Sequence, residues 1–271
     1  MSPADGFLKA VPATGTERKT IGIPLYPNFD SLDVLGPFQT FTMAADRLEP
    51  KLLAASKAPV LSFEGVEITP HATFDQTKSL DVLFVPGGIK LEDVLKAGGP
   101  DKNPFIAFLR RIARPDKEGK PMLITSVCTG ALLLAAAGLL QGFRATTHWN
   151  YKSVLALFPG VTVADGYPRF VIDANRITGG GISSGLDEAM AMVALLLDKK
   201  TARRGQLTMQ YAPNPPFDDG DPSVADPSIL FDVTNSMREG VVKTVAGFQD
   251  YIQKWGDKIE VVDNKTQVIH H

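Results

Sequence analysis

Short apolar runs alternate along the chain with segments whose apolar residues recur at helical spacing. Strands are expected at 20–26, 51–56, 66–69, 79–85 and 121–127, with a glycine loop at 86–88. Helices are expected at 38–48, 103–113, 129–140, 148–158 and 185–197. The apolar runs within 79–85 and 121–127 are typical of strands buried on both faces of a parallel sheet. The alternation therefore predicts an α/β domain with a mostly parallel open sheet flanked by helices.

The domain is expected to run from about residue 20 to about residue 200. Residues 1–19 predict a flexible N-terminal arm, because they mix Pro, Gly and charged residues without an apolar run. Residues 201–271 differ, since a crossing rich in Pro, Asp and Gly at 211–227 precedes helical periodicity at 229–255. We expect this helical C-terminal extension to pack on the domain or on a dimer partner rather than to form its own core.

Two prolines bear on the first elements. Pro24 cannot donate a hydrogen bond to a neighbouring strand, which weakens the strand prediction at 20–26. Pro37 suits the first turn of a helix, so the first helix is expected to begin after Gly36. Later in the chain, residues 161–180 predict a hairpin-like meander with its turn at 173–175.

Composition narrows the classes of function. The chain is 44% hydrophobic and 21% charged with a net charge of −2, and it has no basic block that would favour binding to nucleic acid. The apolar run at 131–140 has about half the length that a membrane-spanning helix needs. The N-terminus lacks an apolar signal core, and a single cysteine cannot form an internal disulfide. A cytoplasmic protein is therefore expected.

The single cysteine, Cys128, lies where a buried strand is predicted to meet a helix. The segment 126–130, Ser-Val-Cys-Thr-Gly, is the cysteine counterpart of the nucleophile elbow that carries serine in other α/β enzymes. An adjacent helix N-terminus would favour a thiolate. Most free cysteines are small buried apolar residues, but the position at an elbow favours a covalent nucleophile.

A nucleophile needs a group that takes and returns its proton, and three residues are candidates. His148 stands beside Trp149 and could act as a base or as a structural hydrogen-bonding group. His71 follows Pro70 in a predicted loop and is a weaker candidate. Asp33 stands in an apolar run after the first strand, where it could be a helix cap or a buried carboxyl group with a raised pKa. The residue pattern leaves these alternatives open.

Other kinds of site have less support. The glycine cluster at 179–185 does not have the GxGxxG spacing, and Leu186 stands where a phosphate-binding loop would carry Lys. One cysteine and two widely separated internal histidines give no metal-ligand spacing. Neither a nucleotide nor a metal is expected. No chemical role is assigned to the terminal pair His270 and His271.

Together, these segments resemble the ThiJ/PfpI superfamily from about residue 20 to about residue 200. The resemblance rests on segments 32–37, 85–88 and 125–130. It is narrowed to isonitrile (isocyanide) hydratases by segments 144–149, 177–182 and 210–217. The resemblance implies a flavodoxin-like fold of the class I glutamine amidotransferase type, a homodimer and a hydratase that needs no cofactor.

The resemblance also implies roles for particular residues. Cys128 would attack the terminal carbon of an isocyanide, and Asp33 would supply and take protons, which favours the catalytic alternative for this aspartate. Thr129 would orient the intermediate. The N–H groups of a glycine loop would face the sulfur, and a second loop would approach the site; the residues concerned are Gly87, Gly88, Gly180 and Ile182.

Departures from the wider superfamily separate the possible activities. Thr129 stands where protease and stress-type members carry His, which argues against a Cys-His peptidase. Asp33 stands where many deglycases and glyoxalases carry Glu. The alternatives to an isocyanide hydratase are a non-catalytic redox or ligand sensor and a glyoxalase-like or amidase-like enzyme that uses the same cysteine. No membrane or nucleic-acid partner is expected.

Overall fold

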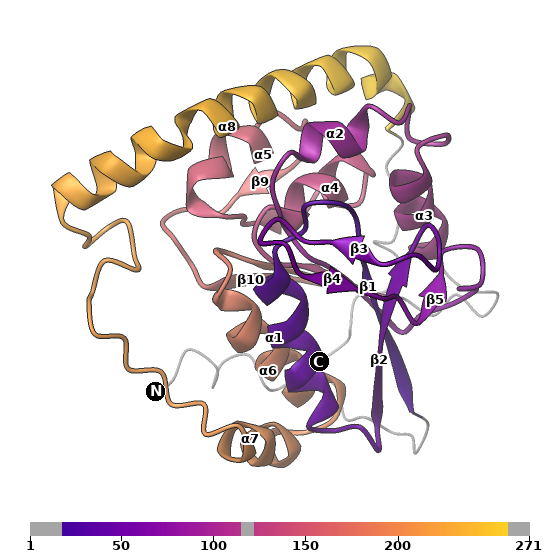
Figure 1. The fold of residues 1–271 in the computed structure, drawn as a ribbon, viewed down its shortest axis with the longest axis vertical. Helices are drawn as coiled ribbons and strands as arrows, with labels where there is room; N and C mark the ends of the chain where they lie inside the picture. The colour runs from indigo at the N-terminus through magenta and orange to yellow at the C-terminus, as the bar shows by residue number, and fades with distance from the viewer. Residues whose placement is uncertain (1–17, 115–121, 260–271) are drawn as a thin grey trace.

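A seven-stranded, mostly parallel sheet forms the centre of the computed structural model, which describes residues 18–114 and 122–259 (Figure 1). The strands are β1 (Lys19–Pro24), β2 (Leu48–Ala54), β5 (Ala72–Thr73), β6 (Val82–Val85), β7 (Leu123–Ser126), β10 (Phe170–Asp173) and β11 (Arg176–Gly179). Their order is β10-β11-β7-β6-β1-β2-β5, and only β10 and β11 pair in the antiparallel direction. The predicted α/β fold with a mostly parallel open sheet is confirmed. The expected N-terminal arm lies outside the described residues except for its last two.

Helices cover both faces of the sheet because the chain proceeds from β1 to β2 toward one edge and from β6 to β7 toward the other. Right-handed crossovers then place the helix after β1 and the helices after β6 on opposite faces. The helix α1 (Ser31–Thr42) packs against α6 (Ser184–Leu196), and α7 (Lys199–Thr208) packs against α6. The other helices of the domain are α2 (Leu91–Leu95), α3 (Pro104–Ile112), α4 (Gly130–Ala136) and α5 (Lys152–Leu155). In the sheet, the strand order reverses between β1 and β6. Open α/β sheets bind ligands at such a position.

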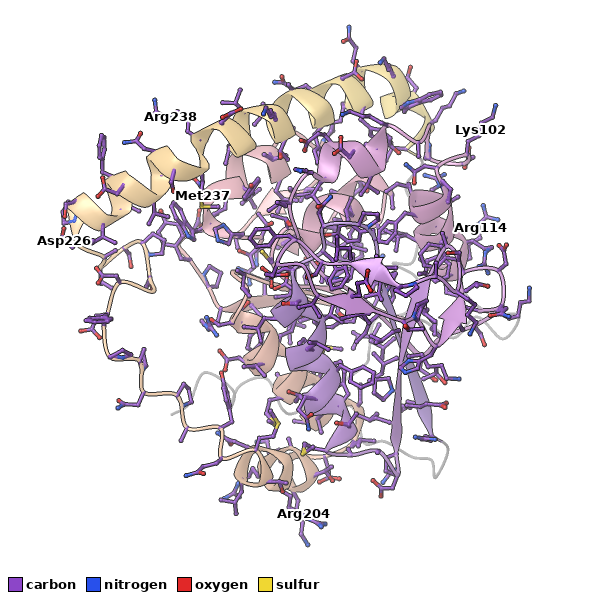
Figure 2. The ribbon with its side chains drawn as sticks, in the orientation of Figure 1. Lys102, Arg114, Arg204, Asp226, Met237 and Arg238 are labelled. Atoms are coloured by element: carbon purple, nitrogen blue, oxygen red, sulfur yellow. The ribbon has the colours of Figure 1, made fainter. Side chains whose placement is uncertain are left out.

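The last helix, α8 (Pro227–Trp255), lies along α2 and α5 of the same chain (Figure 1). It begins where the Asp226 side chain accepts a hydrogen bond from the Ser228 N–H, at the end labelled in Figure 2. Its C-terminal half buries Thr244, Phe248 and Tyr251. Within the part of the chain that the structure describes, no helix is long and apolar enough to cross a membrane.

The first helix begins seven residues earlier than predicted, at Ser31 rather than at Phe38. The Asp30 side chain accepts hydrogen bonds from the N–H groups of Leu32 and Asp33 and so caps the helix at this point. Pro37 lies inside the helix and not in its first turn. The sequence prediction used the proline as the start signal and overlooked the aspartate, and the error matters because the helix carries Asp33.

Several other boundaries also differ from the prediction. The helix expected at 129–140 ends at Ala136, before Gly138 adopts a positive φ of 79°. The helix expected at 148–158 is a 3-10 turn, Trp149–Tyr151, followed by the short α5. The strand expected at 66–69 is β4 (Glu67–Ile68), which pairs only with β3 (Val60–Leu61) outside the main sheet. A second small sheet joins β8 (Arg144–Ala145) to β9 (Thr162–Val163).

Candidate active site

Cys128 stands at a sharp turn between β7 and α4, as the elbow pattern predicts. Its backbone adopts the left-handed region with φ of 55°, which costs a residue with a side chain about 1–2 kcal/mol. Two hydrogen bonds hold it there: the Cys128 N–H donates to the Gly180 carbonyl at 2.8 Å, and the Thr147 hydroxyl donates to the Cys128 carbonyl at 2.8 Å. A strained nucleophile position fixed from both sides is typical of a functional site.

Asp33 lies beside the cysteine, on the first turn of α1, with no exposed surface. One carboxylate oxygen, Oδ2, accepts a hydrogen bond from the Gly87 N–H at 2.8 Å, and the other, Oδ1, has no hydrogen-bond partner among the described residues. Of the two alternatives left open by the sequence, the buried carboxyl group is correct, since Asp30 caps the helix.

The glycine loop after β6 closes the site from a second side. A Cβ atom at Gly87 would lie 2.6 Å from the Thr129 nitrogen and 2.8 Å from Asp33 Oδ2, so no other residue fits without moving the site. The Gly88 N–H donates to the Thr129 hydroxyl at 2.9 Å, and this hydroxyl donates to the Gly88 carbonyl at 2.8 Å. The N–H groups of the loop therefore bind Asp33 and Thr129, and the expectation that they face the sulfur stays a prediction.

Burial controls the electrostatics of the pair. It raises the pKa of Asp33 well above the ordinary value, and the negative charge of Asp30 adds to this, against the lowering effect of the Gly87 N–H and the nearby Cys128 thiol. It also raises the pKa of the Cys128 thiol, and the charge of Asp33 raises it further. The Thr129 N–H lowers the cysteine pKa, as a helix N-terminus should, but burial outweighs it. Each group therefore holds its proton more tightly than usual, and a negative charge on Asp33 makes ionisation of the thiol harder.

The loop after β11 forms the third side. The Gly180 carbonyl holds the Cys128 N–H, and the Gly180 N–H donates to the Arg169 carbonyl at 2.9 Å. The Ile182 side chain keeps 36% of its surface exposed and lines a cleft of about 390 Å³ that adjoins the elbow. The structure therefore brings both residues of this loop to the site.

The two internal histidines differ in position. His148 lines the cleft, its Nδ1 accepts a hydrogen bond from the Asn150 N–H at 3.3 Å, and burial lowers its pKa to about 4. It is therefore neutral at pH 7. His71 accepts a hydrogen bond from the Leu52 N–H at 2.9 Å and stacks on Phe38, which gives it a structural role beside β2 and β5.

Sequence reasoning missed a second buried acid. Glu188 of α6 has no exposed surface, and neither of its carboxylate oxygens has a hydrogen-bond partner among the described residues. A Cβ atom at Gly179 would lie 2.4 Å from its Oε2, so the carboxyl group fills space left by that glycine at the end of β11. Burial and the charge of Asp33 raise its pKa. The signal in the sequence was Gly179, because a glycine at the end of a strand leaves room for a side chain from the helix that faces it.

No group of three or more His, Cys, Asp or Glu residues that could hold a metal occurs within residues 18–114 and 122–259. The arrangement offers instead a thiol, a buried carboxyl group close to it, and a cleft beside them. Such a site can add a sulfur nucleophile to a small electrophile and move a proton in the same step.

Known proteins are similar to this chain in sequence. The isonitrile hydratase of Pseudomonas putida is 39% identical to this chain over 210 residues, which are 78% of this chain and 86% of that protein. The transcriptional regulator GbdR of Pseudomonas aeruginosa is 26% identical over 193 residues, or 69% of this chain, and the match spans 49% of the regulator.

Solved structures agree with the fold. A ThiJ/PfpI family protein from Pseudomonas syringae superposes with a TM-score of 0.76 and 33% identity, covering 89% of this chain and 98% of that one. Drosophila melanogaster DJ-1beta superposes with a TM-score of 0.62 at 18% identity, covering 72% and 100% of the two chains, which concerns the fold alone. The model of the DJ-1/PfpI family matches residues 19–197. With two thirds of its residues matched and a relative at 39% identity, the chain belongs to the DJ-1/PfpI family.

Proposed function

We propose that this protein hydrates isocyanides to N-substituted formamides, with Cys128 as the nucleophile and Asp33 as the acid and base. The observation that carries the proposal is the burial of the Asp33 carboxyl group beside Cys128: a Cβ atom at Gly87 would lie 2.8 Å from both Asp33 Oδ2 and Cys128 Cβ. The similarity to the isonitrile hydratase of Pseudomonas putida supports the substrate class. The activity is that of a hydro-lyase and requires no cofactor.

The first half of the reaction forms a covalent intermediate. The thiol proton passes to Asp33 while Sγ attacks the terminal carbon of R–N≡C. The new C–S bond leaves an electron pair on that carbon, which takes the proton back from Asp33. The product is a thioimidate, Cys128–S–CH=N–R, and Asp33 is again a carboxylate.

The second half releases the formamide. Water adds its oxygen to the thioimidate carbon, and its proton reaches the nitrogen through Asp33, which gives a tetrahedral intermediate. The hydroxyl proton of this intermediate then passes by way of Asp33 to the departing sulfur, the C–S bond breaks and C=O forms. The products are R–NH–CHO and the Cys128 thiol. The Gly88 N–H donates a hydrogen bond to the Thr129 hydroxyl and so holds Thr129 in place. The backbone N–H of Thr129 then stabilises the sulfur in each step.

The test is an assay of the purified chain with a simple alkyl isocyanide, in which formamide is measured by chromatography and the thioimidate by intact mass. We expect formamide from the wild type and none from Cys128→Ala. Asp33→Asn should lose about 10²–10⁴-fold in rate. Asp198→Asn makes the same chemical change at the cap of α7, far from the elbow, and should leave the rate unchanged. No formamide from a range of isocyanides would disprove the proposal.

A sensor is the second candidate, because the chain is 26% identical to a transcriptional regulator. It predicts a sulfenic or sulfinic mass shift on Cys128 under mild peroxide, a change in partner binding, and no turnover of isocyanide. A glyoxalase-like enzyme would instead consume methylglyoxal without glutathione.

We also propose a cytoplasmic homodimer. The crossing at 211–226 and the first part of α8 expose apolar side chains to solvent, including Phe217 at 75% and Phe231 at 64%. A monomer at micromolar concentration in sedimentation would refute the dimer.

A further inference from the structure

A groove along α7 takes no part in the proposed reaction. It encloses about 560 Å³, and its lining includes Lys200, Arg203, Arg204, Leu207 and Tyr211. Within the part of the chain that the structure describes, none of its three cations has an ion-pair partner. The Leu207 side chain keeps 82% of its surface exposed. This α7 groove therefore offers positive charge around an exposed apolar contact.

The crossing that follows α7 carries the opposite charge. Between the last arginine of α7 and Arg238, the sequence contains five aspartates and no Lys, Arg, His or Glu. Every residue from 212 to 221 is exposed. Within this stretch the segment 217–219 reads Phe-Asp-Asp, and the Phe217 side chain keeps 75% of its surface exposed. The segment 217–219 therefore complements the α7 groove, because it joins an exposed ring to adjacent negative charges.

The crossing does not neutralise the groove of its own chain. Pro213, Pro215 and Pro216 fix φ in the stretch between the two, which favours a stiff, extended backbone. Figure 1 shows the crossing leaving α7 and running along the outside of the domain toward α8. None of the ion pairs among the described residues joins the crossing to α7. Opposite charges are thus neighbours in the sequence without meeting in the fold.

The acidic segment is also held in place at its far end. The Asp219 carboxylate accepts a hydrogen bond from the Asp226 N–H at 2.8 Å, just before α8 begins. With prolines on one side and this hydrogen bond on the other, the segment is already ordered while its ring stays exposed. A segment ordered in advance loses less conformational entropy when it binds.

We propose that the α7 groove binds the segment 217–219 of a second copy of this chain. The groove ends at Ala212, five residues before Phe217, and an extended chain of this length covers about 16 Å. Two complementary surfaces so close together can pair reciprocally around one two-fold axis, as in isologous dimers. A nucleic acid on the same cations would lie beside the acidic crossing and be repelled by it. The inference rests on the proposed homodimer and names two surfaces that hold it together.

Charge reversal on each side tests the contact in the full-length protein. Arg203→Glu with Arg204→Glu reverses the groove, and Asp218→Lys with Asp219→Lys reverses the segment. Because each change occurs twice in a symmetric dimer, we expect either pair to raise the Kd of the dimer at least about tenfold. Sedimentation velocity over a range of concentrations measures these constants.

The variant with all four substitutions separates a direct contact from damage to the fold. Its groove is acidic and its segment is basic, so opposite charges meet again, and the Kd should return to within about threefold of the wild type. Substitutions that merely disturbed the fold would not rescue one another. Lys102→Glu with Arg114→Glu is the matched control and should leave the Kd unchanged, because both cations are exposed and lie away from Arg204 (Figure 2).

A cross-link on the wild type gives a second measurement that needs no variant to fold. A carbodiimide joins a carboxylate to a lysine amine in contact with it. A mixture of unlabelled and isotope-labelled chains should therefore yield cross-linked peptides of Asp218 and Lys200 that combine one chain of each kind.

The outcomes separate the contact from the dimer. A dimer whose Kd neither reversal changes, or a cross-link that forms only within one chain, would overturn the inference and leave the homodimer standing. Weakening by both reversals without recovery in the combined variant would also overturn it. A wild type that stays monomeric at micromolar concentration would refute the homodimer itself.

Discussion

Glu188→Gln tests whether a buried carboxyl group beside the site keeps its proton. Glu188 is fully buried without a hydrogen-bond partner among the described residues, and burial and the charge of Asp33 raise its pKa. An ionised carboxylate in this position would carry a large desolvation cost. We therefore expect the folded protein to keep the proton at pH values where the unfolded chain has already released it.

The size of the effect follows from this linkage. The ordinary pKa of a glutamate is 4.5, so below that pH both states are protonated and the group costs nothing. As the pH rises above 4.5, the folded state must take up a proton that the unfolded state has lost, and the free energy of unfolding falls by about 1.4 kcal/mol per pH unit. The fall continues until the folded carboxyl group itself ionises.

The glutamine side chain of the variant cannot ionise, so the variant should escape this loss. Urea unfolding followed by tryptophan fluorescence gives the free energy of unfolding of both proteins at pH 5, 6 and 7. We expect the stability of Glu188→Gln relative to the wild type to rise with pH over this range, by up to about 1.4 kcal/mol for each pH unit at which the folded wild type keeps the proton. Glu67→Gln, at an exposed glutamate of β4, is the matched control and should show no such rise. A difference that stays constant with pH, or one that favours the wild type at pH 7, would refute the reasoning.

Three further predictions concern the elbow. Gly87→Ala should abolish activity, or lower the melting temperature strongly, because the new Cβ would lie 2.8 Å from Asp33 Oδ2; kinetics and thermal unfolding measure both. Thr147→Val should lower the free energy of unfolding by about 1–3 kcal/mol, since it leaves the buried Cys128 carbonyl without its donor, and urea unfolding measures the loss. His148→Asn should leave the shape of the pH–rate profile between pH 5 and pH 8 unchanged, because the pKa of His148 is already lowered to about 4. The disappearance of a rise or fall of the rate within that pH range would contradict this prediction.

The sheet and the elbow could be predicted because local signals decide them. The run at 121–127 is apolar on both faces, and Cys128 and Gly130 follow it directly, so strand, turn and helix are encoded within ten residues. The start of α1 was also encoded locally, by Asp30, but Pro37 gave a competing signal that the packing of α1 against α6 overrides.

The relation between Asp33 and Cys128 could not be derived from spacing, because 95 residues separate them and only the sheet order brings them together. The residue pattern left a helix cap and a buried acid as equal alternatives for Asp33, and the family resemblance favoured the acid. Glu188 gave even less information. It follows Asp187 on α6, and a pair of acids on a helix usually faces solvent. Its burial depends on which side of α6 meets the sheet.

The state of the cysteine distinguishes a hydratase from a redox sensor. Cysteines that sense peroxide hold a standing thiolate. Here burial and the charge of Asp33 raise the pKa of Cys128, and no cation in the described part of the chain offsets them. The thiolate therefore forms when Asp33 takes the proton, a step that an isocyanide can drive because its carbon accepts both the sulfur and that proton.

Peroxide oxidises the thiolate form of a cysteine, and the raised pKa of Cys128 keeps that form scarce, so Cys128 should oxidise slowly in the wild type. Asp33→Asn removes the negative charge that raises the cysteine pKa. The variant should react faster than the wild type with peroxide at pH 7, measured by mass spectrometry, while it hydrates isocyanides more slowly. Rapid oxidation of the wild-type cysteine that the substitution does not accelerate would instead favour the sensor.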